Sequence, residues 1–318
     1  MDFSLTAAQA GRRALGRSLA DGLGATWSPL DVVRRARDAG VFTGDADGVA
    51  DVVLLEAMAA ESAAPAVALA LHITVVRSMP APLPADLVGA VVLTSDAVPS
   101  LDAGRLSGRA GWLAPVRGKG VAVVGARQGT DLVACLVPLD APGVVILPVE
   151  TNGLEGLPCA HLELANAPCE ILGSPQPVMA RARLLLAAAG LGMGRRALHE
   201  ALVAARALER RGPGGEQTVQ GLLADAATEL DAAMVVVWGA AQAARVDLAD
   251  ASMAKLLATE AAQRAVLRAT QAVGLGSFER GHVLERLSQD VRALELFAGR
   301  TEALREAVAE RVLPRGPR

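Results

Sequence analysis

The feature that most constrains the fold is a set of long, alanine-rich helical patterns in the last part of the chain. Beyond residue 173, apolar residues recur at three- and four-residue spacing in four segments: 178–211, 217–251, 251–274 and 282–314. Alanine is the strongest helix former and has a small side chain, so such helices can pack closely. Long helices joined by short loops form antiparallel bundles. The sequence therefore predicts a C-terminal antiparallel four-helix bundle over 173–318.

The remaining residues divide into two regions of different texture. Residues 84–172 carry short β-branched runs separated by turn residues, which is typical of a small antiparallel sheet or barrel. Residues 1–83 are helical, with Ser28 as the expected N-cap of one helix and a long buried pattern that we expect Pro65 to break. The predicted fold class is therefore α+β: an N-terminal helical domain (1–83), a middle β domain (84–172) and the C-terminal bundle.

Charge and hydropathy exclude several classes of protein. The formal net charge is −3 and neither sign dominates a long segment, which gives no electrostatic support for nucleic-acid binding. The longest nearly apolar run, 63–76, is too short for a membrane span, which needs about 20 residues. The N-terminus lacks the charge and apolar order of a signal peptide. We therefore expect a soluble cytoplasmic protein.

The common chemical motifs are weak in this chain. The three cysteines, Cys135, Cys159 and Cys169, form no CxxC pair, and buried structural roles suit them better than catalysis. The histidines lie in different predicted elements without metal-ligand spacing, so we expect no metal site. Glycine-rich fragments at 190–194 and 274–281 do not follow a strand of a βαβ unit, which argues against a Rossmann site. Residue types alone indicate only an α+β protein with a helical bundle.

Several phrases, in order along nearly the whole chain, are similar to those of the acyl-CoA dehydrogenase family of flavoproteins. They are LSGRAGWL and LVACLVPLDAPGV in the middle region, and QTVQGLLAD, ASMAKLLATEAAQRAV, TQAVGLG and LERLSQD in the last. The resemblance implies FAD as cofactor and removal of a hydrogen from each of Cα and Cβ of an acyl-CoA thioester. In such a reaction the flavin accepts the β-hydride, and a carboxylate base must take the α-proton.

By the same resemblance, this chain lacks the catalytic base. Most members read Tyr-Glu-Gly-Thr in the last region, and that glutamate is the base. The aligned residues here are Phe297, Ala298, Gly299 and Arg300. Other members place the glutamate on the first long helix of this region, where the aligned residue is Ala182. A methyl group cannot abstract a proton, so we expect no catalytic residue at Ala298 or Ala182 unless another carboxylate, such as Glu295 or Glu302, is recruited.

The family's contacts to the flavin ring within one subunit are mostly missing as well. The family's Trp-x-Thr/Ser phrase, whose hydroxyl faces the flavin, is Trp112-Leu113-Ala114 in this chain. Trp112 alone persists, and a core tryptophan explains it equally well. Arg300 stands where the family has a small hydroxyl residue.

The family's contacts that cross a dimer interface to the ADP half of the neighbour's FAD are matched better. By the resemblance, more of those residues than of the ring-contact residues occur at the aligned positions of this chain. Arg211 aligns with the arginine that pairs with the pyrophosphate, a role that suits a guanidinium through charge-assisted hydrogen bonds. Gln271 and Gly274 align with a Gln-x-x-Gly segment that approaches the ADP moiety, where glycine permits close backbone approach. Arg211 can also be interpreted as one of several loop arginines with no contact to a cofactor.

This asymmetry leads to the hypothesis of a degenerate subunit that pairs with a competent homologue. The chain resembles the subunit of α2β2 heterotetrameric family members that act on steroid side-chain CoA thioesters. FAD would be shared across the subunit interface, the bundle would carry the hetero-oligomer contacts, and the isolated chain would be inactive. Two alternatives stay open: a stand-alone flavoenzyme with another base or altered chemistry, and a non-enzymatic scaffold.

Overall fold

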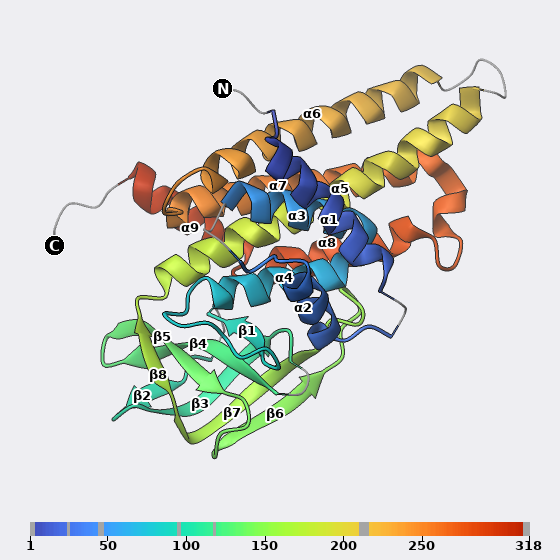
Figure 1. The fold of residues 1–318 in the computed structure, drawn as a ribbon. Coiled ribbons are helices and arrows are strands. Elements are labelled where there is room, and N and C mark those ends of the chain that lie inside the picture. Colours follow the sequence, from blue (N-terminus) through green and yellow to red (C-terminus); the bar gives the residue numbers. More distant parts are fainter. Residues whose placement is uncertain are drawn as a thin grey trace.

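The chain begins with helices, continues into a sheet and ends with helices. The computed structural model describes residues 4–23, 26–43, 48–93, 97–116, 119–209 and 216–313. Although the helical parts lie at opposite ends of the sequence, they join into one helical body that lies against the sheet (Figure 1). This order of elements confirms the predicted α+β class.

The N-terminal helices are α1 (Ala7–Asp21), α2 (Pro29–Asp38), α3 (Gly48–Glu61) and α4 (Ala63–Val76). Ser28 caps α2 as predicted, because its hydroxyl accepts a hydrogen bond from the backbone N–H of Asp31 at 3.2 Å. The expected break at Pro65 is wrong in position. The helices separate at Ser62, and Pro65 lies in the first turn of α4, where its missing N–H leaves no helical bond unmade.

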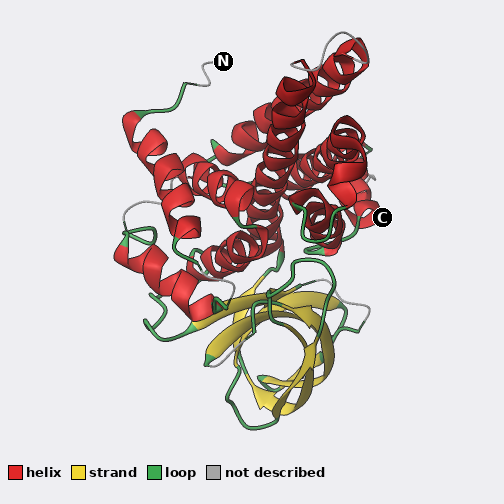
Figure 2. Ribbon diagram, turned by 90° about the vertical axis from the view of Figure 1, so that its right-hand side faces the viewer, coloured by secondary structure: helices red, strands yellow, loops and turns green. Residues whose placement is uncertain are grey.

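The strands curl into a barrel-like sheet (Figure 2). They are β1 (Val88–Val92), β2 (Ser100–Asp102), β3 (Arg105–Leu113), β4 (Gly120–Gln128), β5 (Asp131–Pro138), β6 (Val144–Val149), β7 (Cys159–Pro168) and β8 (Glu170–Gly173). Their order is β6-β7-β3-β2-β4-β5-β8, with β1 paired to β4. Most pairs are antiparallel as predicted, but β1 runs parallel to β4 and β2 meets β4 in a parallel bridge. β1 is buried along its length beside α4, the setting in which parallel pairing is usual.

The C-terminal helices are α5 (Gln176–Glu209), α6 (Glu216–Ala241), α7 (Leu248–Val273), α8 (Val283–Leu296) and α9 (Thr301–Val312), with the short 3₁₀ helix η1 (Gly274–Phe278) after α7. Helices α5 and α7 approach closely because Gly194 has no side chain. A Cβ at Gly194 would lie 3.1 Å from the Cα of Ala262. The helix predicted over 282–314 is two helices, since α8 and α9 are separated at Phe297–Arg300.

The described residues contain neither a membrane helix nor a cluster of metal ligands. Within these ranges, no helix combines the length and apolar character that crossing a bilayer requires. No three His, Cys, Asp or Glu side chains of the same ranges gather where a metal ion could be held. Burial raises the pKa of the Cys135 thiol to about 12 and that of Cys159 to about 11. Both thiols are therefore protonated near neutral pH and act as small apolar core groups.

Candidate active site

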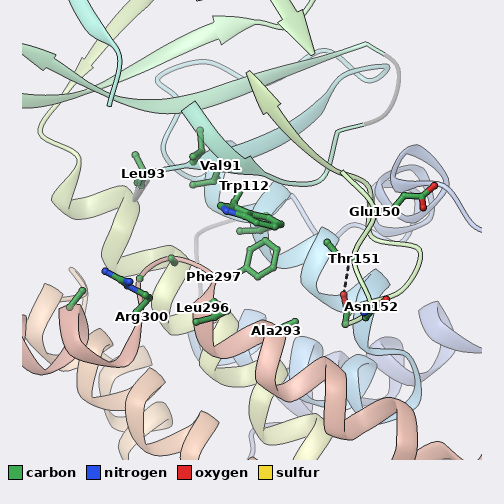
Figure 3. Close-up of a pocket in the computed structure, with 16 residues that line it drawn as sticks. Val91, Leu93, Trp112, Glu150, Thr151, Asn152, Ala293, Leu296, Phe297 and Arg300 are labelled. Atoms are coloured by element: carbon green, nitrogen blue, oxygen red, sulfur yellow. Dashed lines mark hydrogen bonds between the residues drawn. The ribbon is translucent and has the colours of Figure 1, made fainter. Parts of the chain in front are cut away.

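A cavity of about 610 Å³ lies between the sheet and the helical body. Its walls come from α4, β1, the end of β3, the loop that follows β6, and the junction between α8 and α9. The lining is mostly apolar, and the Trp112 indole lies above the Phe297 ring in the view of Figure 3. Elements that are far apart in sequence therefore meet at one largely apolar pocket that is open to solvent on one side, a form that small-molecule sites commonly take.

The junction between α8 and α9 forms the cavity floor and has a left-handed backbone. Helix α8 ends at Leu296, Phe297 is extended, and Ala298 and Gly299 have φ angles of 54° and 115°. Glycine adopts such angles without steric cost, whereas a residue with a Cβ rarely does. This loop, Phe297–Gly299, is called the base loop below because it carries Ala298, the position predicted to lack the base.

Two buried cations hold the base loop from beneath. Lys255 on α7 is fully buried, and its ammonium donates hydrogen bonds to the carbonyls of Glu295 (2.9 Å), Phe297 and Gly299 (3.0 Å). Arg183 on α5 donates from Nε to the carbonyl of Ala298 at 3.0 Å. Every base-loop carbonyl thus accepts a hydrogen bond from a buried cation, and these bonds complete the C-terminal end of α8.

Burial changes the proton affinity of both cations. Removal from water lowers the pKa of Lys255 to about 7, with Arg183 as a second cause and Glu295 acting in the opposite direction. Burial also lowers the pKa of Arg183 to about 10. Desolvation disfavours the charged form of a base, which explains both directions. Three carbonyl acceptors are what allow an ammonium to exist in this position.

The two predicted base positions differ in location. Ala298 lines the cavity, whereas Ala182 is fully buried in α5 and is not among the lining residues. Glu295 is held away from the cavity, since its carboxylate accepts hydrogen bonds from Gln263 and, at 2.5 Å, from Thr301. Glu302 is exposed on α9 and does not line the cavity either. Neither recruited glutamate proposed from the sequence is therefore placed at this site.

Glu150 is the carboxylate that the structure does bring to the cavity. It follows β6 directly and lies at the opposite end of the cavity from Arg300 (Figure 3). Sequence reasoning missed it, although a polar residue at the end of an apolar strand was an available signal. It also missed Lys255 and Arg183. Each is a cationic residue on an otherwise apolar helical face, and that pattern could have indicated a buried charge.

A buried aspartate fixes the loop that carries Glu150. The Oδ1 of Asp290 on α8 accepts a hydrogen bond from the backbone N–H of Leu154 at 2.6 Å, where the backbone is left-handed (φ 56°). Asp290 is 3% exposed, and burial raises the pKa of its carboxyl to about 6 despite that hydrogen bond. The loop after β6 is therefore joined to α8 from its buried side.

Trp112, which the family resemblance relates to the flavin, lies at the end of β3 and lines the cavity. Its backbone is left-handed (φ 58°), its side chain lines the cavity, and the residue is 52% exposed. The indole meets His161 edge-on with ring centroids 5.3 Å apart, and the backbone N–H of Trp112 donates to Nδ1 of His161 at 3.4 Å. An exposed tryptophan on a cavity wall is not a core residue, so the core interpretation is wrong for this position.

The other predicted cofactor residues do not line this cavity. Gln271 is exposed in the last turn of α7, and Gly274 follows it with a φ of 74°. Two large apolar side chains, Leu275 (90% exposed) and Phe278 (74% exposed), lie beside them. Arg211 lies outside the described residues. Exposed apolar side chains of this size on one segment are typical of a surface that a partner covers.

Comparison with known proteins identifies what this architecture is similar to. Residues 174–313 match the family described as acyl-CoA dehydrogenase, C-terminal domain. The probable acyl-CoA dehydrogenase YngJ of Bacillus subtilis is 29% identical over 204 residues, which cover 59% of this chain and 54% of YngJ. The human mitochondrial short-chain specific acyl-CoA dehydrogenase is 30% identical over 232 residues, which cover 65% of this chain and 56% of that protein.

The fold comparison extends over nearly the whole chain. The structure of butyryl-CoA dehydrogenase from Megasphaera elsdenii superposes with a TM-score of 0.84 at 17% identity, covering 98% of this chain and 100% of that one. The sequence matches are shorter, since they span about half the length of the curated relatives.

Proposed function

Because the chain belongs to the acyl-CoA dehydrogenase family, we propose that it is a subunit of an FAD-dependent acyl-CoA dehydrogenase that lacks its own base. The observation that carries the proposal is Ala298, a methyl group at the one family base position that lines the cavity. The hydrogen-bonded frame around that position is complete. A site that keeps the frame and lacks the proton acceptor cannot start α-proton removal, so turnover belongs to a partner.

The residues present fit the flavin ring poorly within this subunit. Trp112 offers an open aromatic face, but the next two residues, Leu113 and Ala114, are apolar and fully buried. Arg300 adds a large cation at the cavity edge. A bound flavin would supply the acceptor for a hydride, and its ring needs placed hydrogen-bond donors to be held and tuned. We assign no reaction step to this subunit's own cavity.

The residues near the end of α7 fit the ADP half of a cofactor held mainly by the partner. Gln271 presents an exposed amide, Gly274 allows close backbone approach, and the neighbouring Leu275 and Phe278 are apolar side chains for a partner to cover. Arg211 would supply charge-assisted hydrogen bonds to the pyrophosphate. We therefore propose a hetero-oligomer in which this chain lends these groups across the interface.

The substrate that we propose for the complex is an acyl-CoA thioester, and the steroid side-chain type is the finer proposal. The partner is a homologous subunit with intact ring contacts and a glutamate. Cytoplasmic location stays a prediction from the sequence.

A second candidate function is a stand-alone flavoenzyme of the same family. Glu150 favours it, because it is the one carboxylate residue among the described lining residues and a carboxylate can accept a proton. It lies at the far end of the cavity from Arg300 (Figure 3), so it would be a different base from that of the family, and altered chemistry would go with it.

The decisive experiment is to purify the chain alone and together with such a homologue. We expect the chain alone to bind little flavin, and the complex to hold about one FAD for each pair of unlike subunits. Acyl-CoA dehydrogenation should require the partner's glutamate and not Glu150 of this chain. A yellow, active homo-oligomer that loses turnover on Glu150→Gln would instead establish the stand-alone enzyme.

The interface contribution needs its own variants. Arg211→Ala and Gln271→Ala in the complex should each weaken FAD retention by about tenfold, the value of one hydrogen bond to a charged group. Arg34→Ala, which removes an exposed arginine of α2, is the matched control and should leave flavin content unchanged. A complex whose flavin is unaffected by both interface variants would favour a scaffold that never touches FAD.

A further inference from the structure

We infer that the cavity binds an amphipathic carboxylate, a small molecule with a flat apolar body and one carboxylate, and holds it unreacted. The carboxylate would lie beside Ala298 and Arg300, in the space where the family has its own glutamate side chain. This inference rests on the same empty base position as the proposed function, but it requires neither FAD nor a partner subunit.

The charges around the base loop call for an anion. Lys255 and Arg183 lie beneath the loop, and Arg300 lies beside it at the cavity edge. In the described part of the chain, none of these three cations forms an ion pair with a carboxylate. Glu295 alone acts against Lys255, and both of its oxygens are occupied by neutral donors, Gln263 and Thr301. Arg183, Arg300 and the protonated form of Lys255, whose pKa is about 7, therefore face one carboxylate.

Burial strengthens the attraction of these positive charges for an anion. Lys255 and Arg183 are almost completely buried, so water and salt screen their charge much less than they screen surface charge. Arg300 is exposed, and its side chain is available to form two parallel hydrogen bonds with a carboxylate. A ligand carboxylate at Ala298 would be attracted by all three groups, and the methyl side chain leaves it room.

The apolar walls define the rest of the ligand. Trp112 is 52% exposed although it is the largest apolar side chain at the site, and Phe297 lies below it in the view of Figure 3. Leu71 of α4 and Val91 of β1 continue the apolar lining. Two aromatic rings in the lining favour a flat apolar body that packs against them, and its burial would cover the exposed indole.

Glu150 sets the orientation. Among the described lining residues, the charged side chains are Arg300 and Glu150, which lie at opposite ends of the cavity. A carboxylate is attracted to the Arg300 end and repelled at the other, so the ligand should carry one anionic group and end in a neutral group near Glu150.

The test compares an acid with its neutral amide on the flavin-free chain. The probes are 4-phenylbutyrate and 4-phenylbutyramide, which share one apolar body, and the measurement is the Kd from calorimetry at neutral pH. We expect the acid to bind at least about tenfold more tightly, the effect of a hydrogen bond to a charged group. Equal affinities, or saturable binding of neither probe, would overturn the inference.

Two pairs of proteins locate the carboxylate. Arg300→Gln should remove most of the preference for the acid while leaving amide binding unchanged. Ala298→Glu fills the space with the protein's own carboxylate and should abolish binding of the acid. Ala298→Gln is equal in size and neutral, so it also reduces the space but should weaken binding of the acid less, since it adds no negative charge. Acid binding that is as tight in Ala298→Glu as in Ala298→Gln contradicts the assigned position.

Circular dichroism establishes that each variant is folded, and Arg300→Gln decides the question if Ala298→Glu is not. An unchanged acid preference in folded Arg300→Gln then rejects the assigned site. The flavin content of the hetero-complex is measured separately, so failure of this inference and failure of the proposed function give different results.

Discussion

The base loop has two faces that differ in kind. Toward the cavity it offers the methyl group of Ala298 and the ring of Phe297, with no proton acceptor of its own, and the exposed Arg300 follows it directly. Toward the protein interior, each of its carbonyls accepts a hydrogen bond from a buried cation. One face carries no carboxylate, and on the other face every carbonyl has a hydrogen-bond donor.

The difference teaches that the geometry of a site and its reactivity have separate physical origins. The side chain at position 298 can change to a methyl group without exposing a polar atom, because it points to a cavity. The carbonyls beneath cannot lose their donors without a large cost, since a buried polar group must be hydrogen-bonded. The hydrogen bonds beneath the base loop are therefore required for folding stability, whether or not the residue at position 298 takes part in a reaction.

The largest expected effect comes from the buried face. Lys255→Met fills a similar volume but removes three hydrogen bonds from the base-loop region. We expect the free energy of unfolding to fall by about 3 kcal/mol or more, because several buried carbonyls lose their donor together. Urea denaturation measures this.

The sequence provides a matched control for that substitution. Lys119 is the other lysine of the chain and is exposed, so Lys119→Met should change the unfolding free energy by less than about 0.5 kcal/mol. A similar loss of unfolding free energy in Lys255→Met and Lys119→Met would show that the bonds beneath the base loop do not have the special role in stability assigned to them.

The second effect depends on pH and concerns the loop after β6. Asp290 has its pKa raised to about 6 in the folded state, against 3.8 for the ordinary value, so the folded state binds its proton more tightly. The stabilisation linked to that proton is fully present below about pH 4 and is lost as the pH rises through about 6. Asp290→Asn keeps an oxygen to accept from Leu154 and does not titrate.

Between pH 4 and pH 7 the wild type should therefore lose about 2 kcal/mol relative to Asp290→Asn. Urea denaturation of both proteins at several pH values measures the difference. Parallel pH profiles for the two proteins would show that the buried carboxyl does not titrate between the folded and unfolded states.

The third effect tests the backbone of the base loop. Gly299→Ala places a Cβ at a φ of 115°, about 3.0 Å from Nη2 of Arg183. We expect a loss of about 1–2 kcal/mol in unfolding free energy, from backbone strain and displacement of the arginine. Gly104→Ala is the control, since its φ is also positive (75°) but nothing lies near its Cβ; it should cost less.

The smallest effect is expected on the cavity face. Arg300→Gln removes an exposed charge that caps no helix with its side chain, so the unfolding free energy should change by less than about 0.5 kcal/mol. Thermal unfolding of the variant beside the wild type checks this. A loss comparable to that of Gly299→Ala would mean that the cavity face also supports the fold.

The sequence predicted the parts of this molecule that follow from local periodicity. The long apolar patterns predicted α5 and α7, and Ser28 predicted the start of α2, because spacing and capping are local properties. The parallel pairing of β1 with β4 was not predictable in this way, since the position and direction of β1 depend on how α4, which precedes it, packs in the folded protein.

The same division holds at the site. Resemblance to a family located Ala298 and Trp112 together, and the structure places both at one cavity. Lys255 and Arg183 were missed because their partners are backbone carbonyls 40 or more residues away in sequence, which leave no trace in residue type. Glu150 was missed because its distance from α8 depends on how the barrel sits beneath the helices.

The enclosure of Lys255 also makes the chain its own chemical reporter. An amine-selective label should modify Lys119 at once, because that side chain is exposed, and should reach Lys255 only when α7, α8 and α9 move apart. With these two lysines in the sequence, peptide mass mapping can follow each without ambiguity. The rate at which Lys255 becomes labelled would therefore time the opening of the base loop, with and without a bound ligand or partner.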